Sequence, residues 1–176
     1  MRFREYNSTI DVPNVVVDGS PNAATVLTLT HWPGIAQPPG LAADLSAQMA
    51  FRFIRRGDAP GAEVVTNNHF DQDGLVAMLA LVDPDSAIEH EALLTDVAAA
   101  GDFATYRHRQ AARASMAIWT YAHPERSPLA AHLVGPYEEQ CAVLYEAMLE
   151  LVIPIVVEPD RFRDLLVREL QLQTQQ

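Results

Sequence analysis

Eight consecutive apolar residues, Leu75 to Val82, place the strongest constraint on how this chain can fold. The run follows a polar Asp-Gln-Asp-Gly turn and ends just before Pro84. A helix that is apolar on all of its sides has to be covered on all of its sides. The fold therefore needs layers of structure around this segment, and 176 residues are enough for one domain of that kind.

The rest of the sequence predicts strands mainly in the first part of the chain and helices mainly in the second. Short β-branched or alternating segments indicate strands at 15–17, 25–30 and 64–66. Apolar stripes and Pro or Gly punctuation predict helices over 41–56, 75–82, 86–101, 106–121, 137–152 and 159–172. Gly101 is expected to end the third of these. This order predicts an α/β fold with a mostly parallel sheet flanked by helices and a helical C-terminal part.

Two helix boundaries rest on specific residues. Apolar side chains recur every four positions at Leu41, Leu45, Met49 and Phe53, which predicts that the first helix includes all four. Ser86 and Glu89 have the spacing of a capping box and predict the start of another. We interpret residues 1–176 as a single α/β domain, or as the N-terminal catalytic-type domain of a two-domain architecture.

Composition excludes several kinds of chemistry. All 12 basic residues are arginine, and the net charge is −11. Without lysine, the chain cannot supply the lysine of a Walker loop, of a Schiff-base enzyme or of a protein kinase. The acidic balance also argues against non-specific binding of nucleic acid, which needs a basic patch. It is compatible with a metal site, since carboxylates are metal ligands.

The cellular setting is inferred from cysteine content and hydropathy. Cys141 is the only cysteine, so the chain forms no internal disulfide, as expected of a cytoplasmic protein. No uninterrupted apolar run reaches the roughly 18 to 20 residues of a membrane span. The first five residues lack the apolar stretch of a signal peptide. We expect a cytoplasmic protein that does not enter a membrane.

The segment between the third strand and the apolar run is the most informative for function. His69, Asp71 and Asp73 alternate directly after the strand, and Gly74 follows them. If extended geometry continues through them, all three side chains leave the same face. Ligands of α/β folds gather where a strand ends and a helix begins. A histidine and two carboxylates at that place predict a site for Mg²⁺, Mn²⁺ or Zn²⁺.

The same string allows other interpretations. It is typical of a polar turn in which Asp73 caps the helix. It also resembles the D-x-D-G-T string of haloacid-dehalogenase phosphatases, in which Asp71 would be the nucleophile. That family has Thr where this chain has Leu75, and it usually employs a later lysine. A calcium EF-hand is excluded, because its fifth position needs Asp or Asn and Leu75 occupies it.

The best match is to a third family. His69-x-Asp71-x-Asp73-Gly74 resembles the first motif of the DHH phosphoesterase superfamily, and the resemblance covers residues 66–81. That superfamily includes single-strand exonucleases, pyrophosphatases and phosphodiesterases of short or cyclic nucleotides. Its Asp-His-His motif is not found in this chain. The nearest string begins at Asp18, where Gly and Ser stand in place of the histidines.

The resemblance implies a site with one or two divalent ions, Mn²⁺ or Mg²⁺. The implied metal ligands are His69, Asp71, Asp73, Asp102 and Asp18, and the first three are also the implied catalytic residues. A further aspartate of the family motif corresponds to Asp96 or Asp102. We prefer Asp102, because it follows the expected helix stop and can point into a loop cavity.

Three more residues are candidates for binding substrate. Arg107 and Arg109 follow Asp102 and could clamp a phosphate group. His31 lies in a loop at a strand end, on the same edge as the predicted site.

The resemblance thus implies a metal-dependent phosphoesterase-like protein. Its expected substrate is a small phosphorylated or nucleotide-type molecule with a phosphodiester or phosphoanhydride bond, attacked by metal-activated water. The alternative is a non-catalytic, oligomerising or ligand-binding degenerate domain of the same fold. The terminal helices contain enough apolar residues for the interface of a homodimer.

Overall fold

The computed structural model describes residues 1–165 of the chain. In this part, four strands form one sheet in the order β1-β4-β2-β3, and every neighbouring pair is parallel. The strands are β1 (Arg2–Phe3), β2 (Asn14–Val17), β3 (Thr25–Leu29) and β4 (Val64–Thr66). The predicted α/β class with a parallel sheet is therefore confirmed, and the three predicted strands are β2, β3 and β4. The very short edge strand β1 was not predicted.

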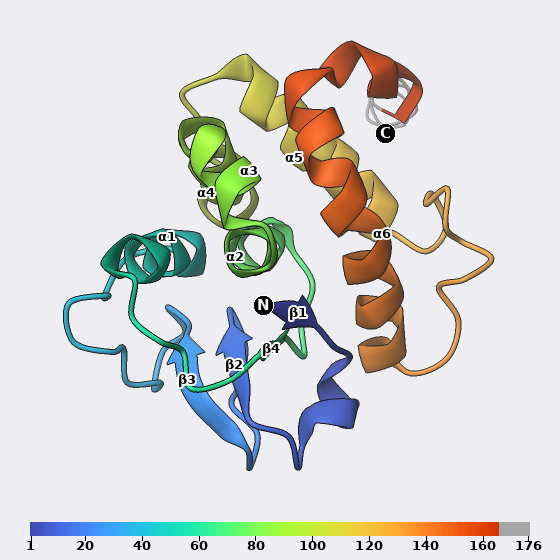
Figure 1. Ribbon diagram of the computed structural model, residues 1–176. Coiled ribbons are helices and arrows are strands. Elements are labelled where there is room, and N and C mark those ends of the chain that lie inside the picture. The colour runs from blue at the N-terminus through green and yellow to red at the C-terminus, as the bar shows by residue number, and fades with distance from the viewer. Residues whose placement is uncertain (166–176) are drawn as a thin grey trace.

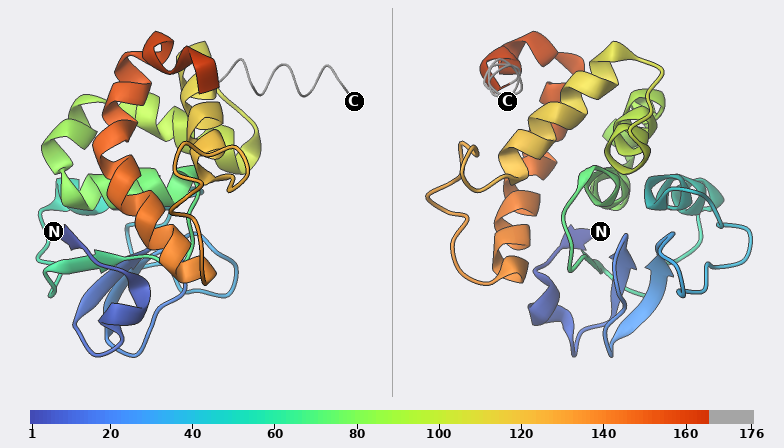
Figure 2. Two further views of the ribbon diagram at one scale, coloured as in Figure 1. Left: turned by 90° about the vertical axis from the view of Figure 1, so that its right-hand side faces the viewer. Right: turned by 180° about the vertical axis from the view of Figure 1, so that it is seen from behind.

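The helices lie beside the sheet in a thicker layer, with the sheet at one end of the molecule (Figures 1 and 2). They are α1 (Ser46–Arg56), α2 (Gln72–Val82), α3 (Pro84–Glu89), α4 (Glu91–Phe103), α5 (Arg109–Ala122) and α6 (Tyr137–Val157). Two short 3-10 segments are η1 (Tyr6–Thr9) and η2 (Pro159–Phe162). Helix α6 runs from this layer down to η1, next to the β1 edge.

Helix α2 is the centre of the domain, as its apolar run predicts. Its residues from Gln72 to Leu81 are all buried. It packs against α1, α4 and α6 and against strands β1, β2 and β4. Burying this segment removes several large side chains from water, each worth about 1.5–3 kcal/mol. The central helix thereby fixes the positions of the loops that lead into it.

Helix α1 begins five residues later than predicted. Leu41 and Leu45 are buried, but they lie in irregular backbone before the helix. The backbone N–H groups of Ser46 and Ala47 donate to the Asp73 carboxylate at 2.7 and 2.8 Å. The first N–H groups of a helix have no partner within the helix, so the acceptor decides where the helix starts. The apolar stripe alone cannot show this.

The predicted helix over 86–101 is two helices. Asp83, rather than Ser86, caps α3 through the Ser86 N–H, and the chain bends at His90 before α4. Gly101 lies inside α4, and the helix ends at Phe103 with Ala104 in the left-handed region at φ 52°. A Cβ at position 101 would come within 2.8 Å of the Gln72 side chain. Glycine at this position allows close packing of α4 on α2 and does not end the helix.

The last predicted helices also differ in their boundaries. Helix α5 begins at Arg109, not 106, because residues 105–108 form a separate loop. Helix α6 continues five residues beyond its predicted end at 152. The predicted helix over 159–172 starts as η2, and its part from 166 onwards lies outside the described residues.

Helix α6 has the length and composition of a membrane-spanning helix, the one such case within residues 1–165. One of its faces, however, belongs to the core of the domain. Cys141, Leu144, Tyr145 and Met148 are buried there, and α6 packs against α5 and α2. One face of α6 is therefore part of the core of the domain.

Candidate functional site

Polar side chains collect where three neighbouring parallel strands end. Asp18 follows β2 directly, His31 lies two residues after β3, and His69 lies three residues after β4. Because the strands are parallel and adjacent, their carboxyl ends meet at one edge of the sheet. The sheet itself brings together these residues from three separate stretches of sequence.

Asp18 is at the centre of this group. Its side chain is 1% exposed, and its backbone is left-handed at φ 47°. Oδ1 accepts hydrogen bonds from Trp32 Nε1 at 3.1 Å and from Ser46 Oγ at 2.8 Å. Oδ2 is buried, and no hydrogen bond from the described residues reaches it. A buried oxygen without a partner is costly, so its presence calls for an explanation.

Asp73 and Asp71 enter the group from the start of α2. Asp73 is fully buried in the first turn, where it accepts the two N–H groups at the start of α1. Asp71 is the N-cap, and its Oδ1 accepts the Gly74 N–H at 2.8 Å. The condition of extended geometry through all three motif residues is not met, since the strand ends at Thr66 and Asp73 lies in α2. The residue that caps α2 is Asp71, whereas the polar-turn interpretation expected Asp73.

His69 bridges Asp71 and the start of α6. Its Nε2 lies 2.8 Å from Asp71 Oδ2, and its Nδ1 lies 3.1 Å from Tyr137 Oη. The edge of the Trp32 ring packs against the imidazole at a centroid distance of 5.5 Å. These three neighbours fix the orientation of the ring.

His31 joins the aspartates of the sheet edge to α4. Its Nε2 lies 3.1 Å from Asp102 Oδ2, 3.5 Å from Asp18 Oδ1 and 3.6 Å from Asp73 Oδ2. Asp102 is in the last turn of α4, not in a loop after a helix stop as expected. Its carboxylate nevertheless reaches the group. We call these six residues the acidic cluster: Asp18, His31, His69, Asp71, Asp73 and Asp102.

Burial and mutual repulsion control the protonation of the cluster. Burial, with repulsion from Asp71 and Asp73, raises the pKa of Asp18 to about 10. Burial also raises the pKa of Asp73 to about 7 and, together with Asp71, that of Asp102 to about 6. Without a counter-charge, part of the cluster therefore stays protonated near neutral pH.

The His69–Asp71 pair behaves in the opposite way. Burial acts to raise the pKa of Asp71, but the hydrogen bonds from His69 and the Gly74 N–H outweigh it and lower the value. The hydrogen bond to Asp71 raises the pKa of His69. This pair favours its charged form, as expected for a carboxylate that accepts two hydrogen bonds.

The geometry provides two sets of ligand atoms for a cation. One atom each from Asp18, His31 and Asp73 lie within 4.8 Å of one another, and the same holds for Asp18, His69 and Asp71. Asp18 belongs to both sets. Carboxylate oxygens with one imidazole suit Mn²⁺ and Zn²⁺, and an oxygen-rich set suits Mg²⁺.

A tightly packed layer supports the cluster from below. Tyr145 Oη donates to the His69 carbonyl at 2.9 Å and accepts from Asn67 Nδ2 at 2.8 Å. Tyr145 Oη and Asn67 Nδ2 both lie against Gly74. A Cβ at position 74 would come within 2.6 Å of Tyr145 Oη and 3.2 Å of Asp18 Oδ2. Glycine is required here because two buried side chains approach the backbone closely.

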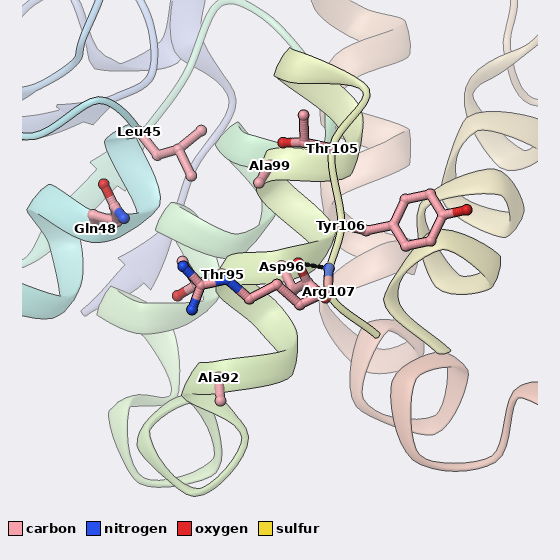
Figure 3. A pocket seen from close by; sticks show the side chains of 9 residues that line it. All are labelled: Leu45, Gln48, Ala92, Thr95, Asp96, Ala99, Thr105, Tyr106 and Arg107. Atoms are coloured by element: carbon pink, nitrogen blue, oxygen red, sulfur yellow. Dashed lines mark hydrogen bonds between the residues drawn. The ribbon is translucent and has the colours of Figure 1, made fainter. Parts of the chain in front are cut away.

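The two predicted phosphate-binding arginines lie away from the cluster. Arg107 lines a separate pocket of about 310 Å³ with Gln48, Thr95 and other residues of α1 and α4 (Figure 3). Arg109 lines another pocket, beside Pro159. Arg107 lies in the loop before α5 and Arg109 is the first residue of α5, and each lines a pocket that contains no residue of the acidic cluster.

Asp96, the other downstream candidate, has a structural role. Its oxygens accept the Arg107 N–H at 2.8 and 2.9 Å and the His108 N–H at 2.7 Å (Figure 3). Burial acts to raise the pKa of Asp96, but these donors outweigh it and hold the pKa below its usual value. Asp96 thus fixes the loop before α5, and Asp102 is the one of the two that joins the cluster.

Sequence reasoning missed five supporting residues, which are Trp32, Ser46, Asn67, Tyr137 and Tyr145. Each of them either is far in sequence from the residue that it contacts or lies in a stretch whose pattern gives no sign of the contact. Asn67 stands next to the motif and interrupts the apolar strand, which was a usable signal. Tyr145 falls in the apolar stripe of α6 and gives no sign that its hydroxyl lies under His69.

The chain belongs to a protein family described as "Family of unknown function (DUF6687)", whose family model matches residues 1–176. Searches of the curated proteins and of the solved structures returned no match.

Proposed function

We propose that this member of the DUF6687 family is a divalent-metal-dependent phosphoesterase that holds Mn²⁺ or Mg²⁺ in the acidic cluster. The observation that carries the proposal is the buried Asp18 Oδ2, which has no hydrogen-bond partner among the described residues and belongs to the one residue that both sets of ligand atoms share. A bound cation would satisfy this oxygen and offset the repulsion among four aspartates.

The donor set fits such an ion. His31 and Asp73 complete one set with Asp18, and His69 and Asp71 complete the other. Since both sets share Asp18, the arrangement suits one ion or a closely spaced pair. Binding would displace the proton between His69 and Asp71, because metal ligands have to be deprotonated. Asp102 would act through His31, holding its ring toward Asp18 and Asp73.

The chemistry follows from the charge of the site. A bound divalent ion lowers the pKa of a coordinated water and stabilises negative charge on a phosphoryl oxygen. The chain itself positions the ligands: the start of α1 fixes Asp73, and Trp32 with Tyr137 fixes His69. We propose a phosphodiester or phosphoanhydride of a nucleotide-type molecule as the substrate. The buried thiol of Cys141 suits a cytoplasmic setting, which we also propose.

Asp71 is a poor candidate for a nucleophile of the haloacid-dehalogenase kind. Its Oδ1 accepts the Gly74 N–H, and its Oδ2 faces His69 at 2.8 Å. Both oxygens are thus already bonded, which lowers their availability for attack on phosphorus. The arrangement favours a role as metal ligand.

Metal binding and hydrolysis are tested on the purified full chain. We expect Mn²⁺ to bind, to raise Tm and to confer hydrolysis of bis-p-nitrophenyl phosphate. Asp71→Ala should lose all three effects, whereas Asp11→Asn, a change at an exposed acid before β2, should keep them. If Mn²⁺, Mg²⁺ and Zn²⁺ all fail to bind, or if Asp71→Ala only lowers stability, the chain is the non-catalytic domain of the alternative interpretation.

A further inference from the structure

We propose that the pocket next to the acidic cluster binds a planar, uncharged ester group, so that the substrate is an aryl-type phosphodiester and not a phosphomonoester or anhydride. The inference rests on the proposed function and narrows it. The pocket has a volume of about 460 Å³ and is lined by His31, Gln37, Ala43, Asp44 and Phe103. We call it the Phe103 pocket.

His31 connects this pocket to the cluster. Its Nε2 faces Asp102, Asp18 and Asp73, and its ring also lines the pocket. Phe103 meets the same ring edge-on, at a centroid distance of 6.4 Å and an angle of 88°. A group esterified to a phosphate at the cluster would therefore lie directly beside Phe103.

Phe103 offers a surface for a planar group. It ends α4 one residue after Asp102, so that one turn of helix supplies both a residue of the cluster and a wall of the pocket. Its side chain is 48% exposed, although it is large and apolar. An aromatic ring left open beside polar groups is suited to stack on, or meet edge-on, another ring.

The other wall residues of the pocket, Gln37, Ala43 and Asp44, belong to a braced loop. The Gln37 side chain accepts the Ala43 N–H at 3.1 Å and donates to its carbonyl at 3.4 Å. From α1, Arg52 donates to the Ala42 carbonyl, and Arg56 donates to the Pro39 carbonyl at 3.1 Å. The loop is thereby held in place without a ligand, as expected of a largely pre-formed pocket.

Charge defines what the pocket accepts. The charged groups acting on the aspartates of the cluster are the other aspartates and the two histidines. Asp44 adds a negative charge at the Phe103 pocket, and Arg107 and Arg109 lie in other pockets. Within the described residues no arginine lines the Phe103 pocket to clamp extra phosphate charge, so a diester with one negative charge fits better than a monoester or an anhydride.

The test compares substrates that share a p-nitrophenolate leaving group. They are the phenyl, methyl and 4-carboxyphenyl diesters of p-nitrophenyl phosphate, and p-nitrophenyl phosphate itself, each with Mn²⁺. Each kcat/KM is divided by the rate with Mn²⁺ alone, which removes differences in intrinsic reactivity. We expect the phenyl diester to exceed the methyl diester by about five- to tenfold. The monoester and the 4-carboxyphenyl diester should both be poorer than the phenyl diester.

Variants assign these preferences to the pocket. Phe103→Ala should bring the phenyl-to-methyl ratio close to one, and Phe103→Trp should preserve or raise it. Tyr106→Ala is the matched control, because this exposed aromatic residue follows three positions later and lines a different pocket, where its ring points away from the other labelled side chains (Figure 3). It should leave the ratio unchanged. Asp44→Asn should improve the 4-carboxyphenyl diester relative to the phenyl diester by about threefold.

The two proposals fail in different ways. If the wild-type chain hydrolyses none of the four substrates with any ion, both proposals are overturned. If it hydrolyses them but prefers the monoester, or if Phe103→Ala keeps the wild-type ratio, the pocket assignment is overturned and the phosphoesterase proposal stands.

Discussion

Replacing Asp18 by asparagine should stabilise the metal-free protein while removing its response to metal. The side chain is 1% exposed, and Oδ2 has no hydrogen-bond partner among the described residues. Asparagine keeps the oxygen that accepts from Trp32 and Ser46 and places an N–H group toward Asp71, which already interacts with Asp18. It also tolerates the left-handed backbone at this position, where φ is 47°.

The magnitude follows from the protonation of Asp18. Its pKa rises from 3.8 to about 10 on folding, so the folded state holds a proton that the unfolded state releases above pH 4. The stability that Asp18 contributes through its raised pKa is fully present below pH 3.8 and is lost as the pH rises toward 10. The free energy of unfolding falls by at most about 1.4 kcal/mol per pH unit, which amounts to roughly 6 kcal/mol by pH 8. Relaxation around a buried charge reduces this, and we expect a gain of about 2–3 kcal/mol for Asp18→Asn.

Chemical and thermal unfolding in EDTA at pH 5 and pH 8 measure this gain. At pH 8 it corresponds to a Tm increase of roughly 5–10 °C for a domain of this size. At pH 5 the difference should be small. Asp11→Asn should change stability little at either pH, because Asp11 is exposed. An Asp18→Asn chain that is less stable than wild type at pH 8, or equally changed at both pH values, would refute the reasoning.

Three further substitutions and one thiol-labelling experiment test separate parts of the structure. Asp96→Asn should lower stability by about 1–2 kcal/mol, through the lost acceptor for the loop before α5, and leave Mn²⁺ affinity intact. Asp102→Asn should instead lower Mn²⁺ affinity and leave stability intact. Isothermal titration would measure the affinity, and unfolding curves would measure the stability. Gly74→Ala should cost about 1–3 kcal/mol, and less in a Tyr145→Phe background, because the new Cβ meets the Tyr145 hydroxyl. Cys141, with a pKa raised by burial to about 11, should react with a thiol reagent at pH 8 only after unfolding; fast reaction in the native state would contradict its burial.

The sequence was most informative where local pattern and tertiary environment agree. The eight-residue apolar run predicts a helix that has to be buried, and α2 is buried throughout. The β-branched segments predict β2 and β4, and alternation predicts β3. The His69 motif predicts a group of polar side chains at the carboxyl edge of the sheet, because strand ends that lead into helices meet there.

Helix boundaries could not be predicted as well, since distant residues decide them. Helix α1 starts where Asp73, 27 residues away from Ser46, accepts its first N–H group. Glycine at 101 has the pattern of a helix end, yet it provides room for Gln72. In both cases, a contact made only in the folded chain outweighs the local preference.

By itself, the sequence determined the α/β class, the central helix and the place along the chain where polar side chains gather. Only the tertiary structure decided which side chains join that place. It showed that His31 and Asp102, both candidates from the sequence, reach the same group, placed Arg107 and Arg109 at other pockets, and left Asp18 Oδ2 buried without a hydrogen-bond partner among the described residues. Periodicity and motif spacing act within one segment of chain. Side-chain convergence depends on how separate segments pack, and residues distant in sequence fix that packing.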